Sequence, residues 1–394
     1  MDINIPLTIK MANLFKLTDI NIPNSVTKIG SDAFSGCILE TIEIPENVSD
    51  IDYSAFNGCY NLSTINVNEN NQNFSSIDGV LFNKDQTIIR KYPNGKKEIK
   101  YIIPDGVVEI GSYAFSDNST LANIEFSEEI STIGDNAFCN CKKLSKVVIY
   151  DEIKTIGNSA FSECSSLEEI EIPESVESIG YGVFENCKSL INIVLPSSIT
   201  SIPSSLFKNC ISLEEIEIPE SVTSIGGSAF SGCTSLETME IPDGVSWIYD
   251  NAFEGCTNIT TIEIPASVYY MYSSAFIGCS NLESIIVDEN NENFISEDGV
   301  LFNKAKTNIL RYPQGKEGTE YKIPSTVTKI DDGAFEGCSG LESIEIPEIL
   351  TSIGNSAFNG CTSLEEIEIP ENVESIGDHA FEGCSGLESI EIPD

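Results

Sequence analysis

The cysteines of this chain recur at a constant interval, and that interval constrains the fold more than any other feature. Seven of them run from Cys141 to Cys279 in steps of 23 residues, and the same step resumes from Cys338 to Cys384. A phenylalanine precedes each of these cysteines by three residues. The same phenylalanine marks 13 repeats, at Phe34, Phe56, Phe115, Phe138, Phe161, Phe184, Phe207, Phe230, Phe253, Phe276, Phe335, Phe358 and Phe381. A 23-residue unit cannot cover its own apolar face, so the copies must stack around a common core.

The pattern within one repeat, residues 216–238, predicts the path of each turn of the stack. Alternating apolar and charged residues at 216–218, ended by proline, indicate a short strand with one buried face. A second inward-facing extended pair is expected at 222–225. Gly226 suits a turn that needs a positive φ angle. Residues 229–233 then bury one side of about one helical turn, which leads to the next strand.

Two repeats are longer than the others, 59 residues instead of 23. Their extra segments, residues 68–103 and 288–323, share the sequence Asp-Gly-Val-Leu-Phe-Asn-Lys and hold 11 of the 21 basic residues. Each segment is predicted to contain a hairpin and to add rungs to the stack. We therefore expect residues 1–394 to form a single solenoid domain with two elaborated repeats.

The repeat IxIPxxVxxIGxxAFxxCxxLxx and the DGVLFNK inserts resemble the leucine-rich repeats of the BspA-like, or Treponema pallidum, type. The resemblance covers nearly the whole chain, from about Leu17 to Asp394. It implies a repeat solenoid, a right-handed α/β-type superhelix with a parallel β-sheet on its concave side. Short helical turns and extended segments would form the other side. It also implies protein–protein contact, often as an adhesin on the surface of bacteria or protists.

Charge and composition exclude several classes of function. With 62 acidic and 21 basic residues the formal net charge is −41, which argues against nucleic-acid binding because phosphates need a basic surface. One histidine, His379, cannot supply a two-histidine metal site or a catalytic triad elsewhere in the chain. We expect no catalytic residue, no metal and no cofactor.

The family resemblance and the N-terminal sequence point to different cellular locations. The resemblance implies the cell surface or the extracellular space, and the chain would then be a fragment of a longer surface protein. The first residues lack the basic start and apolar stretch of a signal peptide, which favours the cytoplasm instead. The chain has no run of about 18 apolar residues, so membrane insertion is not expected.

The 13 cysteines allow three interpretations. Small buried thiols can fill a narrow core position. Disulfides between neighbouring rungs would need distortion, because equivalent Cβ vectors run parallel. Metal binding would need a tetrahedral cluster that side chains in a single file do not provide. In one repeat Asn118 takes the place of the cysteine and can bond the turn backbone; Cys139 lies outside the series and should be the most exposed.

The outward position between the two inward strand residues forms a column down the stack, which we call the glutamate column. Nine of its 14 positions are glutamate, including Glu171, Glu217, Glu240 and Glu263. Like charges about 4.8 Å apart repel by roughly 1 kcal/mol per pair. The column is either an acidic binding strip on the concave face or a solvated face of an acidic protein.

Two adjacent repeats carry aromatic residues where the others have small or polar ones. On the 23-residue step, Trp247 falls beside Tyr270 and Tyr249 beside Tyr272, with Tyr269 nearby. We call these five residues the aromatic patch. Exposed tryptophan and tyrosine are typical of interface anchors, whereas tighter local packing is the alternative.

These observations favour a non-enzymatic scaffold, adhesin-like and at a surface or secreted, that binds a protein through the acidic sheet, the aromatic patch or both. The partner would be a basic protein or a host or extracellular-matrix protein. A glycan-binding surface protein, with sugars stacked on the rings, and a purely structural spacer are the alternatives.

Overall fold

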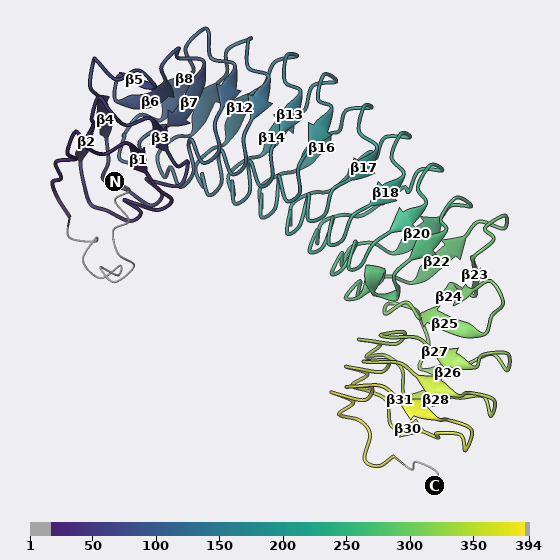
Figure 1. The fold of residues 1–394 in the computed structure, drawn as a ribbon. Helices are drawn as coiled ribbons and strands as arrows, with labels where there is room; N and C mark the ends of the chain where they lie inside the picture. Colours follow the sequence, from purple (N-terminus) through teal and green to yellow (C-terminus); the bar gives the residue numbers. More distant parts are fainter. Residues whose placement is uncertain (1–16, 391–394) are drawn as a thin grey trace. The chain divides into compact units, whose positions relative to one another are not determined.

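The chain folds into a β-solenoid in which each repeat makes one turn, in a computed structural model that describes residues 17–390 (Figure 1). It divides into two units, Met1–Ile199 and Thr200–Asp394, and each is described by itself. The predicted repeat solenoid is confirmed, and it contains little helix. Its continuity as one domain from residue 1 to 394 stays a prediction.

Each unit contains two ladders of short parallel strands. The first ladder uses the strand at the start of each repeat. In unit 1 it comprises β2 (Thr41–Ile44), β4 (Thr64–Val67), β8 (Lys100–Ile102), β10 (Asn123–Glu125), β12 (Lys146–Val148), β14 (Glu169–Glu171) and β16 (Asn192–Val194). In unit 2 it comprises β20 (Thr261–Ile264), β22 (Ser284–Val287), β26 (Glu320–Lys322), β28 (Ser343–Glu345) and β30 (Glu366–Ile367).

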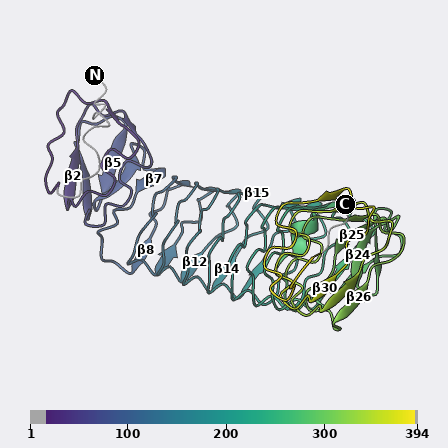
Figure 2. The ribbon, with the colours of Figure 1, turned by 90° about the horizontal axis from the view of Figure 1, so that it is seen from below.

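The second ladder uses the later extended pair of each repeat. In unit 1 it comprises β1 (Lys28–Ile29), β3 (Asp50–Ile51), β9 (Glu109–Ile110), β11 (Thr132–Ile133), β13 (Thr155–Ile156) and β15 (Ser178–Ile179). In unit 2 it comprises β17 (Ser201–Ile202), β18 (Ser224–Ile225), β19 (Trp247–Ile248), β21 (Tyr270–Met271), β27 (Lys329–Ile330), β29 (Ser352–Ile353) and β31 (Ser375–Ile376). In Figure 2, β8, β12 and β14 lie along one edge of unit 1 and β15 lies along the other.

The two longer repeats contain antiparallel strands. Three of these follow one another in unit 1: β5 (Phe74–Ile77), β6 (Val80–Asn83) and β7 (Ile88–Lys91). Their counterparts in unit 2 are β23 (Phe294–Glu297), β24 (Val300–Asn303) and β25 (Asn308–Arg311). The last strand of each set then pairs in parallel with the next strand of the second ladder, so each insert joins the stack.

The turn after the second ladder differs from the sequence prediction. Gly226 does not have a positive φ angle; Ser228 (φ 54°) and Gly232 (φ 74°) do. A Cβ atom at Gly226 would lie 2.5 Å from the backbone nitrogen of Ser204 on the preceding rung. Glycine is used here because two backbones approach closely, not because the turn is left-handed.

The segment after this turn was expected to form about one helical turn. Among residues 17–390 the only helix is the 3₁₀ helix η2 (Ser273–Phe276), which includes the first two residues of one of these segments, Ala275 and Phe276. Elsewhere the same segment is a hydrogen-bonded turn, as in the bond from the Cys233 amide to the Phe230 carbonyl, 3.0 Å long. The positive φ angle at Ser228 interrupts the helical dihedrals just before the segment.

The phenylalanines stack face to face along each unit. Neighbouring rings such as Phe138 and Phe161 have centroids 5.1 Å apart and planes only 3° apart. In the inserts Tyr92 and Tyr312 take the same place, 5.1 Å and 5.3 Å from the next phenylalanine ring. These two rungs raise the aromatic series from 13 members to 15, because each insert supplies a rung that the phenylalanine pattern misses.

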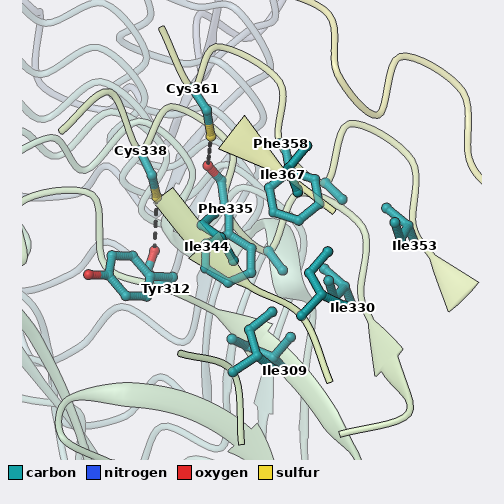
Figure 3. Close-up of a cluster of buried hydrophobic side chains, with 14 of the residues drawn as sticks. Ile309, Tyr312, Ile330, Phe335, Cys338, Ile344, Ile353, Phe358, Cys361 and Ile367 are labelled. Carbon is teal, nitrogen blue, oxygen red and sulfur yellow. Dashed lines mark hydrogen bonds between the residues drawn. The ribbon is translucent and has the colours of Figure 1, made fainter. Parts of the chain in front are cut away.

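The cysteines next to this aromatic stack bond to it across rungs. The Cys361 thiol donates to the Phe335 carbonyl at 3.2 Å, and the Cys338 thiol donates to the Tyr312 carbonyl at 3.7 Å (Figure 3). Equivalent bonds of 2.9–3.2 Å link the other rungs at Cys59, Cys141, Cys164, Cys187, Cys233, Cys256, Cys279 and Cys384. Each thiol therefore fills the core and satisfies a buried carbonyl.

All 13 cysteines are free, and only Cys139 is not fully buried. Its greater exposure was predicted from its position outside the series. Asn118 bonds the turn as expected, since its Oδ1 accepts hydrogen bonds from the amides of Thr120 and Leu121. Its side-chain nitrogen is buried without a partner.

The first ladder is irregular at residues 216–218, where the sequence pattern predicted a strand. Residues 216–218 keep the expected alternation of burial, but Glu217 makes only an isolated bridge and residues 238–241 form no strand. Adjacent rungs carry glutamates side by side at this place, Glu217 next to Glu240. Repulsion between exposed like charges explains why the strand hydrogen bonds are lost while the buried isoleucines hold the chain path.

Candidate binding surface

The aromatic patch is built by the second ladder of unit 2. Strands β19 and β21 pair in parallel, and their register places Trp247 opposite Tyr270 and Ile248 opposite Met271. Because side chains alternate along a strand, Ile248 and Met271 point into the core while Trp247 and Tyr270 point outward. Tyr269, just before β21, is exposed as well.

The five rings form one contiguous cluster, as the sequence step predicted. The centroid of Trp247 lies 5.1 Å from Tyr270, 6.1 Å from Tyr269 and 6.2 Å from Tyr249. Tyr272 lies 5.1 Å from Tyr270, edge to face, and 6.4 Å from Tyr249. Their relative exposures range from 39% to 62%, so a large part of each ring faces solvent.

The corresponding place in unit 1 shows that the fold does not require these rings. There the two strands that precede the insert, β1 and β3, place Lys28 opposite Asp50. Their side chains form an ion pair 2.7 Å long. An ion pair and an aromatic cluster thus occupy the same rungs of the same architecture, which counts against local packing as the reason for the aromatic patch.

The glutamate column lies on the first ladder. Glu171, Glu217, Glu240 and Glu263 are all exposed, with a buried isoleucine on either side except that Met239 precedes Glu240. Glu391, the last member of the column, falls outside the described residues. The predicted alternation of buried and exposed positions is confirmed by this burial pattern.

Two members of the column have lysine partners from the inserts. Lys100 reaches the Glu125 carboxylate at 3.0 Å, and Lys322 reaches Glu345 at 2.5 Å. Lys322 continues the column into the insert, because β26 and β28 place it opposite Glu345. Among residues 17–390, no other glutamate of the column forms an ion pair. The concentration of basic residues in the inserts is visible in the sequence, but this pairing with column glutamates is not.

The structure does not bring the two predicted binding elements into one sheet. The aromatic patch belongs to the sheet β17-β18-β19-β21, whereas Glu263 belongs to the separate pair β20-β22. Glu171 lies in unit 1. The glutamates therefore do not line the aromatic patch and can act on a partner there only through their long-range field.

Burial raises the pKa of core thiols such as Cys141, to about 12, and Cys233, to about 12. The pKa of Cys139 is raised to about 11 by burial and by the carboxylates of Asp117, Glu163 and Glu185. A thiol that stays protonated is a poor nucleophile and metal ligand. Within residues 17–390, no group of three or more His, Cys, Asp or Glu side chains is arranged to hold a metal ion.

Comparison with known proteins identifies a repeat family. The family described as BspA type leucine rich repeat region matches residues 11–101, 87–214, 200–315 and 312–394. A solved leucine rich cell surface protein from Faecalibacterium prausnitzii is 31% identical, with a TM-score of 0.60 over 81% of this chain and 88% of that chain. A leucine-rich repeat protein from Bacteroides ovatus is 27% identical, with a TM-score of 0.53 over 89% of this chain and 86% of that one.

A leucine-rich repeat protein from Eubacterium ventriosum is 29% identical, with a TM-score of 0.56 over 60% of this chain. The match spans 64% of that protein's length. No curated protein matches the sequence. In the part of the chain that the structure describes, none of the helices is long and apolar enough to span a bilayer.

Proposed function

Because the chain belongs to the BspA-type leucine-rich repeat family, we propose that it is a non-enzymatic scaffold that binds a protein partner at a cell surface. The similarity to a leucine rich cell surface protein supports this location. The architecture supports the scaffold role, since each rung contributes one row of outward side chains to an extended surface.

The observation that carries the proposal is the aromatic patch. Five exposed rings gather on two rungs of unit 2, while the equivalent rungs of unit 1 carry the ion pair of Lys28 and Asp50. Tryptophan and tyrosine supply large contact areas at little cost in side-chain entropy, and they dominate interface energetics. We assign most of the binding energy to Trp247 and Tyr270, which lie at the centre of the cluster.

The glutamate column takes a second role in this proposal. Its carboxylates lie on another sheet from the rings, so they steer a basic partner and set its association rate instead of contacting it at the aromatic patch. Substituting Glu217 or Glu240 should therefore slow association at low salt and leave dissociation unchanged.

A pull-down from extracellular matrix and from cell lysate tests the proposal. The baits are the wild-type chain, the variant Trp247→Ala/Tyr270→Ala, and a matched control, Tyr60→Ala/Tyr181→Ala. The control removes two exposed tyrosines of unit 1. All baits are run at low and at physiological salt, because an acidic surface retains basic proteins without specificity.

A partner that survives physiological salt, is lost in the aromatic-patch variant and is kept by the control is the expected result. Retention that is equal for all three baits and elutes with salt would overturn the assignment of the patch and favour a spacer. A glycan array tests the remaining alternative, a glycan-binding protein. A glycan signal that Trp247→Ala abolishes would show that the aromatic patch binds a sugar instead of a protein.

A further inference from the structure

The aromatic patch lies in a part of the chain that has no cations of its own. Residues 209–303 contain 16 aspartates and glutamates and not one lysine, arginine or histidine. Unit 2 as a whole has seven basic and 34 acidic side chains, a net charge of −27. The faces of the five rings are therefore exposed within a strongly negative field that no neighbouring side chain of this stretch can neutralise.

The charge of one carboxylate, that of Asp250, reaches the aromatic patch. The hydrogen bond and the charge of Tyr270 are the main causes that raise the pKa of Tyr272, and the charge of Asp250 adds the smallest contribution. Asp250 follows β19 by two residues and is exposed. Its Oδ1 would lie 3.0 Å from a Cβ atom at Gly227, so the carboxylate extends over the preceding rung. Its negative charge would add to the attraction of a cation held over the rings.

Unit 1 shows how the same architecture accommodates a cation on a ring. Arg90, in the first insert, holds its guanidinium carbon 3.7 Å from the centroid of Tyr53 and donates a hydrogen bond to the Ile51 carbonyl. The insert of unit 2 is a near-copy, and its residue at the Arg90 position is Leu310. Leu310 has no charge and no donor, so this insert supplies no cation to the rungs that carry the aromatic patch.

We propose that the aromatic patch binds arginine side chains from a basic segment of the partner, stacked on Trp247 and Tyr270 with Asp250 as the ionic acceptor. The inference rests on the proposed protein-binding function and names the chemistry that the partner presents. A planar guanidinium fits better than an ammonium, because it can stack on a ring and still donate hydrogen bonds in its plane to a carboxylate.

The chain contains a direct reporter for this site, because Trp247 is its only tryptophan. A tetra-arginine peptide without aromatic residues is titrated at physiological salt while tryptophan fluorescence is recorded. Tetra-citrulline has nearly the same shape and hydrogen-bonding groups but no charge. Tetra-lysine carries the charge on ammonium groups, which are not planar. The expected order of affinity is arginine, then lysine, then citrulline, with citrulline weaker than arginine by about tenfold.

Two variants keep the reporter and test the geometry. Tyr270→Leu leaves an apolar side chain but removes the ring, and should weaken tetra-arginine binding about fivefold. Asp250→Asn should weaken it by a similar factor. The matched control Tyr181→Leu changes an exposed tyrosine of unit 1 and should leave binding unchanged. All three positions are exposed, and unchanged circular dichroism melting would verify the fold.

Equal binding of the arginine and citrulline peptides, or equal losses in Tyr270→Leu and Tyr181→Leu, would overturn the inference. The pull-down separates this failure from failure of the proposed function. A partner lost with Trp247→Ala/Tyr270→Ala but insensitive to competing tetra-arginine would leave the scaffold role intact and refute arginine recognition alone.

Discussion

Two buried cations stand out at the scale of single residues. Lys91 and Arg311 occupy equivalent positions in the two inserts and are 2% and 1% exposed. Lys91 donates to the Tyr113 carbonyl at 3.0 Å, and Arg311 donates to the carbonyls of Gly333 and Glu336. Each side chain fills the interior beside a tyrosine of the aromatic stack, and each loses hydration energy to do so.

Burial lowers the pKa of Lys91 from 10.5 to about 8, against a smaller opposing effect of the Asp117 charge. The folded state therefore binds fewer protons than the unfolded state between these two values, so wild-type stability rises with pH across this window. Below pH 8 the cost of the buried charge is fully present. Lys91→Met should thus be more stable than wild type below pH 8, and this difference should shrink by about 3 kcal/mol towards pH 10.5.

Urea unfolding of both proteins as a function of pH measures this difference. Arg311→Met is the matched control, because an arginine stays charged over the whole window and its difference from wild type should be flat. A flat profile for Lys91→Met as well would show that Lys91 keeps an ordinary pKa in the folded chain.

The cysteines give a second prediction at this scale. Twelve are buried behind thiol–carbonyl hydrogen bonds or core packing. Burial raises the pKa of thiols in both units, as for Cys141 and Cys233. Native thiol titration at neutral pH should label at most Cys139, and denatured titration should label about all 13. Several disulfides in the mass spectrum of the purified chain would contradict this expectation.

At the scale of the strand, charge decides how regular the first ladder is. Pairing is regular where a lysine opposes a glutamate, as in Lys322 and Glu345, and it is lost where Glu217 and Glu240 face each other. The inward residues beside these positions are apolar in both places, Tyr321 and Ile323 beside Lys322 and Met239 and Ile241 beside Glu240. Exposed charge therefore tunes the hydrogen bonding of a strand whose position the core has already set.

The substitution Glu240→Lys should restore regular strand pairing in the first ladder around Glu217 and Glu240. We expect a gain of about 0.5–1 kcal/mol in the free energy of unfolding, because one lysine replaces like-charge contacts with attractive ones to Glu217 and Glu263. Glu345→Lys is the inverse control and should lower stability by opposing Lys322. Denaturant unfolding measures both, and equal effects of the two substitutions would refute the role of charge.

At the scale of the whole molecule, self-repulsion dominates the electrostatics. The net charge of −41 is divided into −14 in unit 1 and −27 in unit 2. Expansion on unfolding separates these charges, so repulsion lowers stability at low ionic strength. The repeat architecture increases this effect, since identical residues are brought to adjacent rungs about 4.8 Å apart.

Raising the salt concentration to about 0.15 M should therefore raise the Tm through screening. Calorimetry at neutral pH measures the shift, and the same experiment near the isoelectric point of about 4.1 should show almost none. A Tm at neutral pH that is unchanged or falls with salt would contradict the prediction.

The sequence alone determined the repeat, the inward and outward positions and the neighbours across rungs. A constant 23-residue step forces equivalent residues into register, so the contact of Trp247 with Tyr270 could be derived by subtraction. The core residues could also be predicted, because the same alternation of apolar and polar residues recurs in every repeat and determines which side chains are buried.

Only the tertiary structure decided features that depend on the distance between rungs or on irregular segments. Position 226 is glycine because a Cβ atom there would lie 2.5 Å from the backbone nitrogen of Ser204 on another turn, which no local pattern reveals. Tyr92 and Tyr312 complete the aromatic stack although their repeats break the 23-residue step. The aromatic patch and Glu263 lie in separate sheets, because β17, β18, β19 and β21 pair with one another and β20 pairs with β22.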